Sequence, residues 1–189
     1  GALVLGFGLP LGTTRVQAAV AAATAERGTQ VPAFLEIRPD NRVRLLCPFM
    51  EGGQGTFTAM AQIVGEELDA DPATFLVEAA PPGEAYVVME NGMRITGGSM
   101  SVRMSYPVMR RLGALARAML LQAGAQKLGV PVGELSTEPG KVVHAKSGRS
   151  VAYGELAEHA MDLPVPDPAS VQLRDPSQFR WIGKPVKRV

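Results

Sequence analysis

The chain has 189 residues with a formal net charge of +1, and 46% of the residues are hydrophobic while 20% are charged. This composition predicts a globular chain, either one domain or one domain with tails, and excludes an intrinsically disordered protein. The nearly balanced charge removes any electrostatic case for nucleic acid as a partner.

Residues 1–30 start with the uncharged stretch GALVLGFGLPL and continue into a segment rich in Ala and Val. The apolar stretch is too short to span a bilayer, so no stable membrane span is expected. It is typical of the back half of an export signal. The alternative is an apolar strand or coil packed on a partner. Residues 1–30 are therefore treated as an N-terminal segment.

Residues 31–162 predict an α+β domain, with β-hairpins and a short mixed sheet packed against two main helices. Ala33 to Ile37 and Val43 to Phe49 predict a hairpin around a Pro-Asp-Asn turn. Apolar residues at helical spacing then predict a helix that Thr56 can cap and that ends near Leu68.

The remaining elements follow in chain order. TFLVEAA predicts a strand, and AYVVM predicts a weaker strand or an extended segment. A long helix follows from about Pro107 to Leu128, with Ser105 as N-cap. KVVHA and SVAY predict a second hairpin, and a short helix follows from Gly154 to Met161. Residues 163–189 contain many prolines and predict an extended linker toward a following domain. Its end carries five basic residues and one acidic residue from 173 to 189, as expected of a solvated tail or a phosphate-binding arm.

Two loops of small residues precede the two main helices: Gly52-Gly53-Gln54-Gly55, and Gly97-Gly98-Ser99-Met100-Ser101. A helix start exposes unpaired N–H groups and the positive end of the helix dipole, which together attract phosphate. Glycine allows an anion to approach the backbone, and amide or hydroxyl groups add donors. Neither loop matches the dinucleotide or P-loop pattern. Ordinary tight turns therefore remain an alternative to phosphate binding.

Other reactive side chains give weaker indications. Glu51, Glu66 and Glu67 are candidate acid–base groups or solvated side chains, and Arg103 is an anion partner or a surface charge. Cys47 is the only cysteine and lies in an apolar run, so we expect a buried hydrophobic role. The histidines, His144 and His159, lack ligand spacing, so no metal site is expected from this chain. No catalytic residue is assigned.

FMEGGQGTFTAMAQIVGEELDAD resembles the M-E-x-G-Q-G-x-x-T segment of molybdopterin-binding large subunits in the xanthine dehydrogenase and aldehyde oxidase superfamily, and within it the isoquinoline 1-oxidoreductase beta-subunit group. The stretch from Gly97 to Leu135 resembles the serine-rich loop and long helix that follow in that group. LGFGLP resembles the end of its twin-arginine export signal, and FRWIGKPVKRV the segment that leads into the next domain. The resemblance therefore covers nearly the whole chain.

The resemblance implies a part of an oxidoreductase that hydroxylates an aldehyde or an N-heterocycle with oxygen derived from water. It implies a molybdenum-containing molybdopterin cytosine dinucleotide as cofactor, and iron–sulfur clusters only on a small partner subunit, with electrons passing there or onward to a cytochrome. The residues that it places against the cofactor are Gly53, Gln54, Gly55, Thr56, Gly98, Ser99, Met100 and Ser101.

The family's large subunit is several times longer, and its catalytic glutamate lies in parts absent here. The resemblance therefore implies that this chain is inactive alone and works with the remainder of the large subunit or a second chain that carries it. It also implies folded export to the bacterial periplasm, although the twin arginines are not in this sequence. A non-catalytic assembly or scaffold module without cofactor contact is the alternative, and a stand-alone enzyme with Glu51 or Glu66 as base ranks last.

Overall fold

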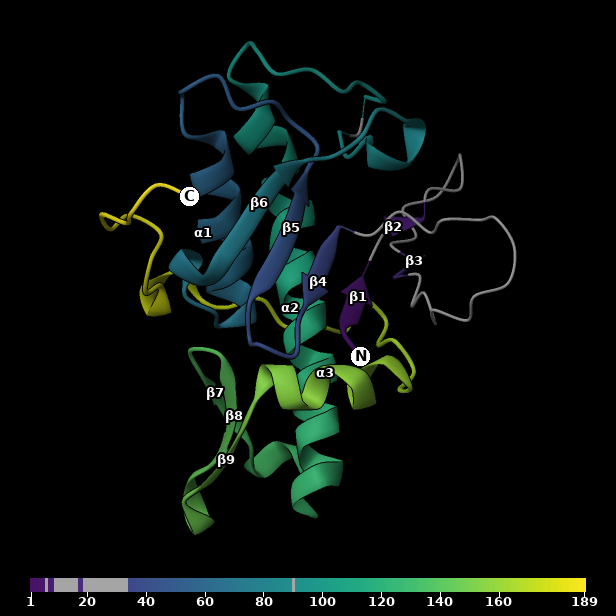
Figure 1. Cartoon of the computed structure of the whole chain (residues 1–189), viewed down its shortest axis with the longest axis vertical. Coiled ribbons are helices and arrows are strands. Elements are labelled where there is room, and N and C mark those ends of the chain that lie inside the picture. Colours follow the sequence, from purple (N-terminus) through teal and green to yellow (C-terminus); the bar gives the residue numbers. More distant parts are fainter. Residues whose placement is uncertain (6, 9–16, 19–33, 90) are drawn as a thin grey trace.

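The computed structural model describes residues 1–5, 7, 8, 17, 18, 34–89 and 91–189. A four-stranded sheet lies in front of the long helix α2, which continues downward to a small three-stranded sheet (Figure 1). The helix α1 lies beside α2, and α3 crosses α2 below the larger sheet (Figure 1). This arrangement confirms the expected α+β class.

The larger sheet has the order β1-β4-β5-β6, with β1 at Leu3–Leu5, β4 at Leu35–Ile37, β5 at Val43–Cys47 and β6 at Phe75–Ala79. The antiparallel pairing of β4 with β5 confirms the first hairpin. The strand β6 runs parallel to β5, so the intervening α1 serves as the crossover helix. Two further short strands, β2 at Phe7–Gly8 and β3 at Gln17–Ala18, pair with each other.

The first described residues belong to the folded domain. Leu3 and Leu5 are each 1% exposed in β1, which pairs with β4. Leu3–Leu5 therefore form an apolar strand packed within this chain, whereas the two sequence interpretations of the stretch, an export-signal remnant or packing on a partner, stay predictions. Most of residues 6–33 lie outside the described residues, and the Ala-rich connection falls there.

The helix α1 spans Thr56–Leu68, as predicted, but α2 spans Met100–Leu128 and begins seven residues before the predicted start at Pro107. Pro107 lies inside α2, where it cannot donate a backbone hydrogen bond to the carbonyl one turn earlier. Ser105 is not the N-cap, because its hydroxyl donates to the Ser101 carbonyl at 2.6 Å. Pro107 therefore lies in the second turn of α2, and not in the first turn that its local sequence predicts.

Of the two predictions for AYVVM, a weaker strand or an extended segment, the strand is wrong. Glu84–Tyr86 form a 3₁₀ turn, Val87 has extended dihedral angles, and residues 87–89 belong to no strand. The segment is anchored by its side chains, because Tyr86 and Met89 are buried and the Tyr86 ring lies 5.0 Å from the ring of Phe34. Apolar composition indicated burial correctly but not backbone pairing.

The small sheet consists of β7 at Ser136–Glu138, β8 at Lys141–His144 and β9 at Arg149–Ala152. The antiparallel β8–β9 pair confirms the second hairpin, whereas β7 is an additional strand that the sequence interpretation missed. The helix α3 follows at Tyr153–Met161, close to the predicted range.

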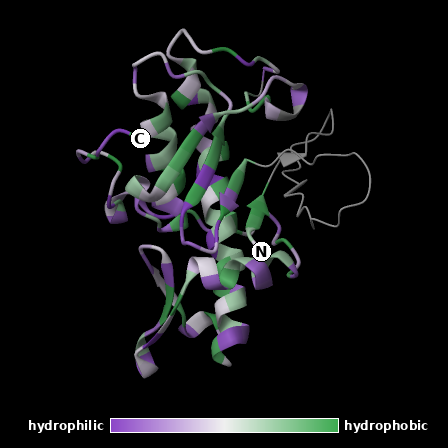
Figure 2. Cartoon of the chain, viewed as in Figure 1, coloured by the Kyte–Doolittle hydropathy of each residue, from purple (hydrophilic) through white to green (hydrophobic). Residues whose placement is uncertain are grey.

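The core lies between the larger sheet and the helices, and the strands β4 to β6 are largely hydrophobic (Figure 2). At the crossing of α1 and α2, Gly113 lets the two helix backbones approach closely, and a Cβ added there would contact the Val64 carbonyl.

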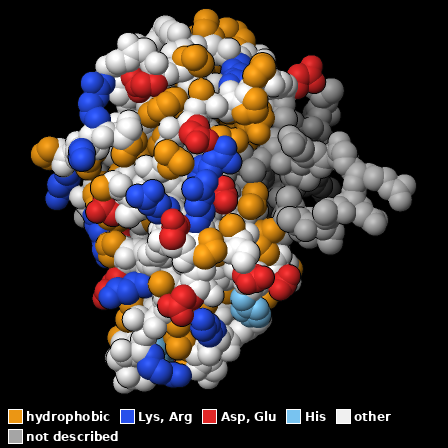
Figure 3. Space-filling view, viewed as in Figure 1, with side chains coloured by type: hydrophobic (Ala, Val, Ile, Leu, Met, Phe, Trp, Pro, Cys, Tyr) orange, Lys and Arg blue, Asp and Glu red, His pale blue; other side chains and the backbone are white. Residues whose placement is uncertain are grey.

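On the face seen in Figure 3, basic and acidic side chains are interspersed. Among the described residues, no helix combines the length and apolar character needed to cross a bilayer.

The segment 163–189 is irregular, apart from a 3₁₀ turn at Pro176–Gln178, and it packs against α1. The side chain of Gln62 donates to the Trp181 carbonyl at 2.9 Å, and the backbone N–H of Val189 donates to the Thr58 hydroxyl at 3.2 Å. The C-terminus therefore lies beside the start of α1 (Figure 1). The division of the chain at residues 30 and 162 stays a prediction.

Candidate functional site

The loop before α1 uses its own carboxylate to bind the backbone. Glu51 accepts hydrogen bonds from the N–H groups of Gly53 at 2.8 Å, Gly55 at 2.9 Å and Phe57 at 2.9 Å. The bond from Gly55, followed by those from Phe57 and Gly53, lowers the pKa of Glu51 below its usual value. The start of α1 therefore already holds an anionic group, contrary to the expectation of free N–H groups for phosphate.

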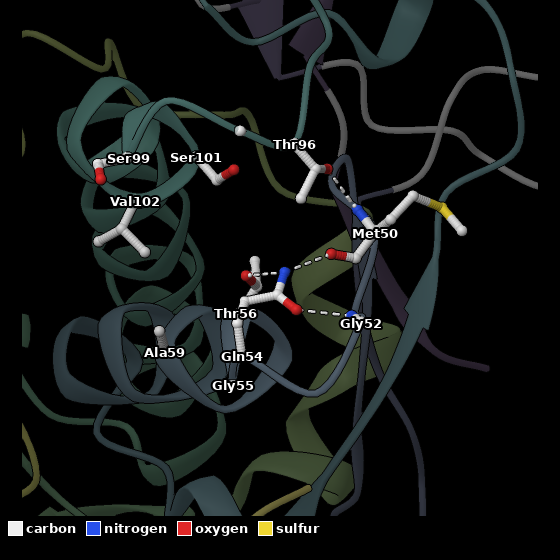
Figure 4. Close-up of a pocket in the computed structure, with 11 residues that line it drawn as sticks. Met50, Gly52, Gln54, Gly55, Thr56, Ala59, Thr96, Ser99, Ser101 and Val102 are labelled. Carbon is white, nitrogen blue, oxygen red and sulfur yellow. Dashed lines mark hydrogen bonds between the residues drawn. The ribbon is translucent and has the colours of Figure 1, made fainter.

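Gln54 closes this loop with its amide. Its carbonyl oxygen accepts from the Gly52 N–H at 2.6 Å, and its amide nitrogen donates to the Met50 carbonyl and to the Thr56 hydroxyl oxygen, both at 2.9 Å (Figure 4). Thr56 does not cap α1. The N-cap position belongs to Gly55, at φ 89°, and glycine has no side chain that could cap the helix. Both ends of the Gln54 amide are thus engaged within the loop.

The start of α2 is different, because no side chain caps it. Ser99 is the N-cap residue at φ 56°, in the left-handed region, and its hydroxyl makes no capping hydrogen bond. The N–H of Met100 donates to the Gly97 carbonyl at 3.0 Å. A 29-residue helix thus presents its positive end and an uncommitted hydroxyl at one place.

The two loops face each other across an open pocket of about 810 Å³ (Figure 4). The Thr96 hydroxyl accepts from the Met50 N–H at 2.8 Å and joins the two sides. Among the described residues, no charged side chain lines the pocket. Its lining consists of Met50, Gly52, Gln54, Gly55, Thr56, Ala59, Thr96, Gly97, Ser99, Ser101 and Val102.

The structure brings together most, but not all, of the residues expected to bind a cofactor. Five of the eight line the pocket: Gln54, Gly55, Thr56, Ser99 and Ser101. Gly53, Gly98 and Met100 belong to the same loops but do not line it. Their roles toward a cofactor stay predictions.

Sequence reasoning missed two residues that shape this pocket. Thr96 belongs to the TGGS stretch but was not selected as a site residue. Arg94 donates to the carbonyls of Pro48 at 2.7 Å, Ala80 at 2.6 Å and Pro81 at 2.5 Å, which fixes the approach to Thr96 against the end of β5. An arginine in a loop carries no sequence signal for such a role. Arg103, the candidate anion partner, is exposed and does not line the pocket.

Two of the candidate acid–base residues are structural. Glu66 and Glu67 are both 0% exposed, so their expected solvation is wrong. Glu66 accepts from the backbone N–H groups of residues 180–182 at 2.8 to 3.1 Å. Glu67 forms an ion pair with Arg110 at 2.5 Å and accepts from the Arg174 N–H at 2.9 Å. A helix period could not reveal these partners, because they lie more than a hundred residues along the chain or on another helix.

The cysteine and the histidines behave as structural residues. Cys47 is 0% exposed, and burial raises the pKa of its thiol to about 11. His144 is buried and interacts with Ser147 at 2.7 Å and Glu134 at 3.1 Å, while His159 contacts Gln126 at 2.7 Å. In the part of the chain that the structure describes, no cluster of His, Cys, Asp and Glu has metal-binding geometry.

Several relatives of known identity are similar to this chain. The beta subunit of isoquinoline 1-oxidoreductase from Brevundimonas diminuta is 37% identical over 147 residues, which is 73% of this chain and 19% of that protein. The membrane-bound aldehyde dehydrogenase [pyrroloquinoline-quinone] of Gluconacetobacter polyoxogenes is 25% identical over 96% of this chain and 23% of its own length. A nicotinate dehydrogenase subunit from Pseudomonas putida is 29% identical over 85% of this chain and 13% of its own length. The chain thus spans less than a quarter of the length of these relatives.

Solved structures share the fold. The Cu,Mo-CO dehydrogenase in its carbon monoxide reduced state matches with a TM-score of 0.52 and 22% identity, over 65% of this chain and 15% of that one. The reconstituted CO dehydrogenase from Oligotropha carboxidovorans gives the same values. The family model of the molybdopterin cofactor-binding domain matches residues 2–186, which include both loops of the pocket and the packed C-terminal segment. Because that match covers nearly the whole chain, this protein belongs to the molybdopterin cofactor-binding domain family.

Proposed function

We propose that this chain is the cofactor-binding portion of a molybdenum hydroxylase, and that the pocket between the starts of α1 and α2 holds phosphate groups of molybdopterin cytosine dinucleotide. The observation that carries the proposal is the meeting of the two loops in one pocket, within a domain of the molybdopterin cofactor-binding family. When bound, the cofactor supplies the chemistry that oxidises a substrate carbon with oxygen derived from water.

The donors in the pocket fit a phosphate-bearing group on the α2 side. Ser99 contributes a hydroxyl without a capping bond, next to the N–H groups of the first helical turn. The Thr96 hydroxyl accepts one hydrogen bond from Met50, so its proton is available to an incoming oxygen. These residues, with Ser101, would hold the phosphates.

On the α1 side, the loop forms a wall of the pocket but offers few free N–H donors. Glu51 occupies the N–H groups there, and Gln54 holds the loop closed with three hydrogen bonds. We therefore assign Gln54 a positioning role: it fixes the wall of the pocket, and the Thr56 hydroxyl to which it donates remains able to donate toward a ligand.

The whole protein, in this proposal, oxidises an aldehyde or an N-heterocycle. Its remaining parts, on the same chain or a second one, supply the catalytic glutamate, and a small iron–sulfur subunit receives the electrons, with a cytochrome as onward acceptor. The isolated 189-residue chain would be inactive. We also propose a periplasmic location, from the resemblance of residues 5–10 to the end of an export signal; cell fractionation tests it.

The test compares Ser99→Ala and Gln54→Ala with the matched controls Ser150→Ala and Gln122→Ala in the assembled complex. Ser150 is exposed on β9, and Gln122 lies on α2 remote from the pocket. Molybdenum is measured by elemental analysis and the released nucleotide by mass spectrometry. A lost hydrogen bond to a charged group corresponds to about tenfold weaker retention in Ser99→Ala. Unchanged molybdenum and nucleotide in both pocket variants would refute the assignment of the pocket.

A second candidate is a scaffold module that keeps the fold without contacting a cofactor. It is favoured by Glu51, which places an ionised carboxylate at the start of α1, and by the absence of cationic side chains among the described pocket residues. Wild-type complex without molybdenum or cytosine nucleotide would select this candidate. Because one relative is named for pyrroloquinoline quinone, the same analysis should include that quinone.

A further inference from the structure

A second, polar pocket of about 410 Å³ lies at the other end of α1. We call it the arginine pocket. The 13 residues of α1 separate it from the first pocket by roughly 20 Å along the helix axis. Its volume lies within the roughly 300–1,000 Å³ typical of ligand sites. The arginine pocket is lined by Asp69, Arg117, Ser136, Thr137, Gln172, Leu173, Arg174, Gln178 and Arg180.

Positive charge exceeds negative charge around this pocket. Three arginines line it, namely Arg117, Arg174 and Arg180, against one carboxylate, Asp69, which is paired with Arg174 at 3.1 Å and lies 3.5 Å from Arg180. Two neighbouring carboxylates offset part of this charge or are engaged elsewhere: Glu67 pairs closely with Arg110, at 2.5 Å, and more distantly with Arg117, at 3.7 Å, and Glu66 binds backbone N–H groups. The end of α1 adds a partial negative charge, but the three arginines outweigh it.

The arginines hold many unused donors. A guanidinium has five N–H donors. The side chain of Arg174 is 10% exposed, and its Nε is buried without a hydrogen-bond partner. Arg117 donates one side-chain hydrogen bond, to the Gln172 carbonyl at 3.2 Å, and forms a long ion pair with Glu67 at 3.7 Å. Among the described residues, the Arg180 side chain has its ion pair with Asp69, at 3.5 Å, as sole partner. A buried donor without a hydrogen-bond partner costs free energy. The unpaired Nε of Arg174 therefore indicates a partner that the protein itself does not supply.

The arginines also repel one another. Burial lowers the pKa of Arg117, and the nearby charge of Arg174 lowers it further. A bound anion would relieve that repulsion. A single water molecule could join the Arg174 Nε to the Asp69 Oδ1, which likewise lacks a hydrogen bond. Because a water takes only about 30 Å³ of liquid volume, one molecule would leave most of the pocket unfilled and most N–H donors of Arg117 and Arg180 unused.

We propose that the arginine pocket binds a small oxyanion of the phosphate class, either inorganic phosphate or the phosphate of a monoester. Planar guanidinium groups match the oxygens of phosphate in a bidentate manner. The hydroxyl of Ser136 and the amide of Gln178 line the same pocket and offer neutral donors. The anion would connect α2, through Arg117, to the C-terminal segment, through Arg174 and Arg180, and so hold that segment in place.

The experiment titrates the chain with inorganic phosphate by isothermal calorimetry at constant ionic strength, with chloride as the reference anion. Phenyl phosphate provides the monoester arm. We expect saturable binding at one site. Arg117→Gln and Arg180→Gln should each weaken it about 10- to 100-fold, which corresponds to one lost hydrogen bond between charged groups. The matched control is Arg111→Gln, an exposed arginine of α2 outside the pocket, which should bind as the wild type does.

Absence of saturable phosphate binding would overturn the proposal, and so would binding that Arg117→Gln and Arg180→Gln leave unchanged. Binding abolished only by Ser99→Ala would place the anion at the start of α2 and also overturn it. Circular dichroism checks folding, and Arg180→Gln stays informative if Arg117→Gln fails to fold, because the Arg180 side chain is 42% exposed. Molybdenum retention is a separate measurement, so failure here does not touch the proposed function.

Discussion

Replacing Glu66 by glutamine should release the C-terminal segment from α1. In the wild type one carboxylate oxygen accepts from the Arg180 N–H at 2.8 Å, and the other accepts from those of Trp181 at 2.8 Å and Ile182 at 3.1 Å. Glutamine keeps a single oxygen. Its NH₂ group would face at least one backbone N–H, which leaves two donors opposed in a site where Glu66 is 0% exposed.

The magnitude follows from these contacts. An unsatisfied buried donor costs about 1–3 kcal/mol, and the two remaining bonds lose their charged acceptor. Together these effects predict a loss of about 2–4 kcal/mol in the free energy that holds the segment on α1. Part of that loss appears as local detachment and not as global unfolding, because residues 163–189 form an irregular segment at one side of the domain.

The sole tryptophan supplies a local probe, because Trp181 lies within the turn that Glu66 holds. Glu66→Gln should increase acrylamide quenching of Trp181 and shift its emission to the red, and it should lower the urea midpoint. Glu84→Gln, at an exposed glutamate, is the control and should change stability by less than about 0.5 kcal/mol. If quenching and urea midpoint both match the wild type, the three hydrogen bonds do not anchor the segment and the reasoning is refuted.

Two further predictions concern the α1 side of the molecule. Gly113→Ala should destabilise the chain by about 1–3 kcal/mol in urea unfolding, because the new Cβ would press on the Val64 carbonyl and lie 2.9 Å from the Glu67 Cβ. The control Gly133→Ala has open space around its Cβ, and equal midpoints for the two variants would contradict the close helix crossing. Glu51→Gln should lower the urea midpoint at neutral pH but progressively less in acid. The backbone bonds lower the pKa of Glu51 from 4.5, so their stabilisation is present above that value and is lost as the pH falls through the lowered pKa. A constant difference between wild type and Glu51→Gln from about pH 6 to about pH 3 would contradict this role.

The sequence by itself determined the elements whose evidence is local. The period of apolar residues from Phe57 to Leu68 predicted α1 within its observed bounds, and strand-like runs around turn residues predicted both hairpins. The two loops of small residues before the main helices were also visible as sequence patterns. Local propensity and periodicity act over a few residues, so such features can be read from the chain directly.

Only the tertiary structure decided how those loops are used. It showed that Glu51 fills the N–H groups at the start of α1, so that the free helix start in the pocket is that of α2. It also showed that α2 begins at Met100, because the packing of a long helix against α1 outweighs the local penalty of Pro107. Glu66 meets its partner Arg180 across 114 residues of sequence, and Arg117 and Arg174 approach each other only through the folded C-terminal segment. Contacts at such separations leave no periodic trace in a single sequence, since they depend on how distant elements pack in space.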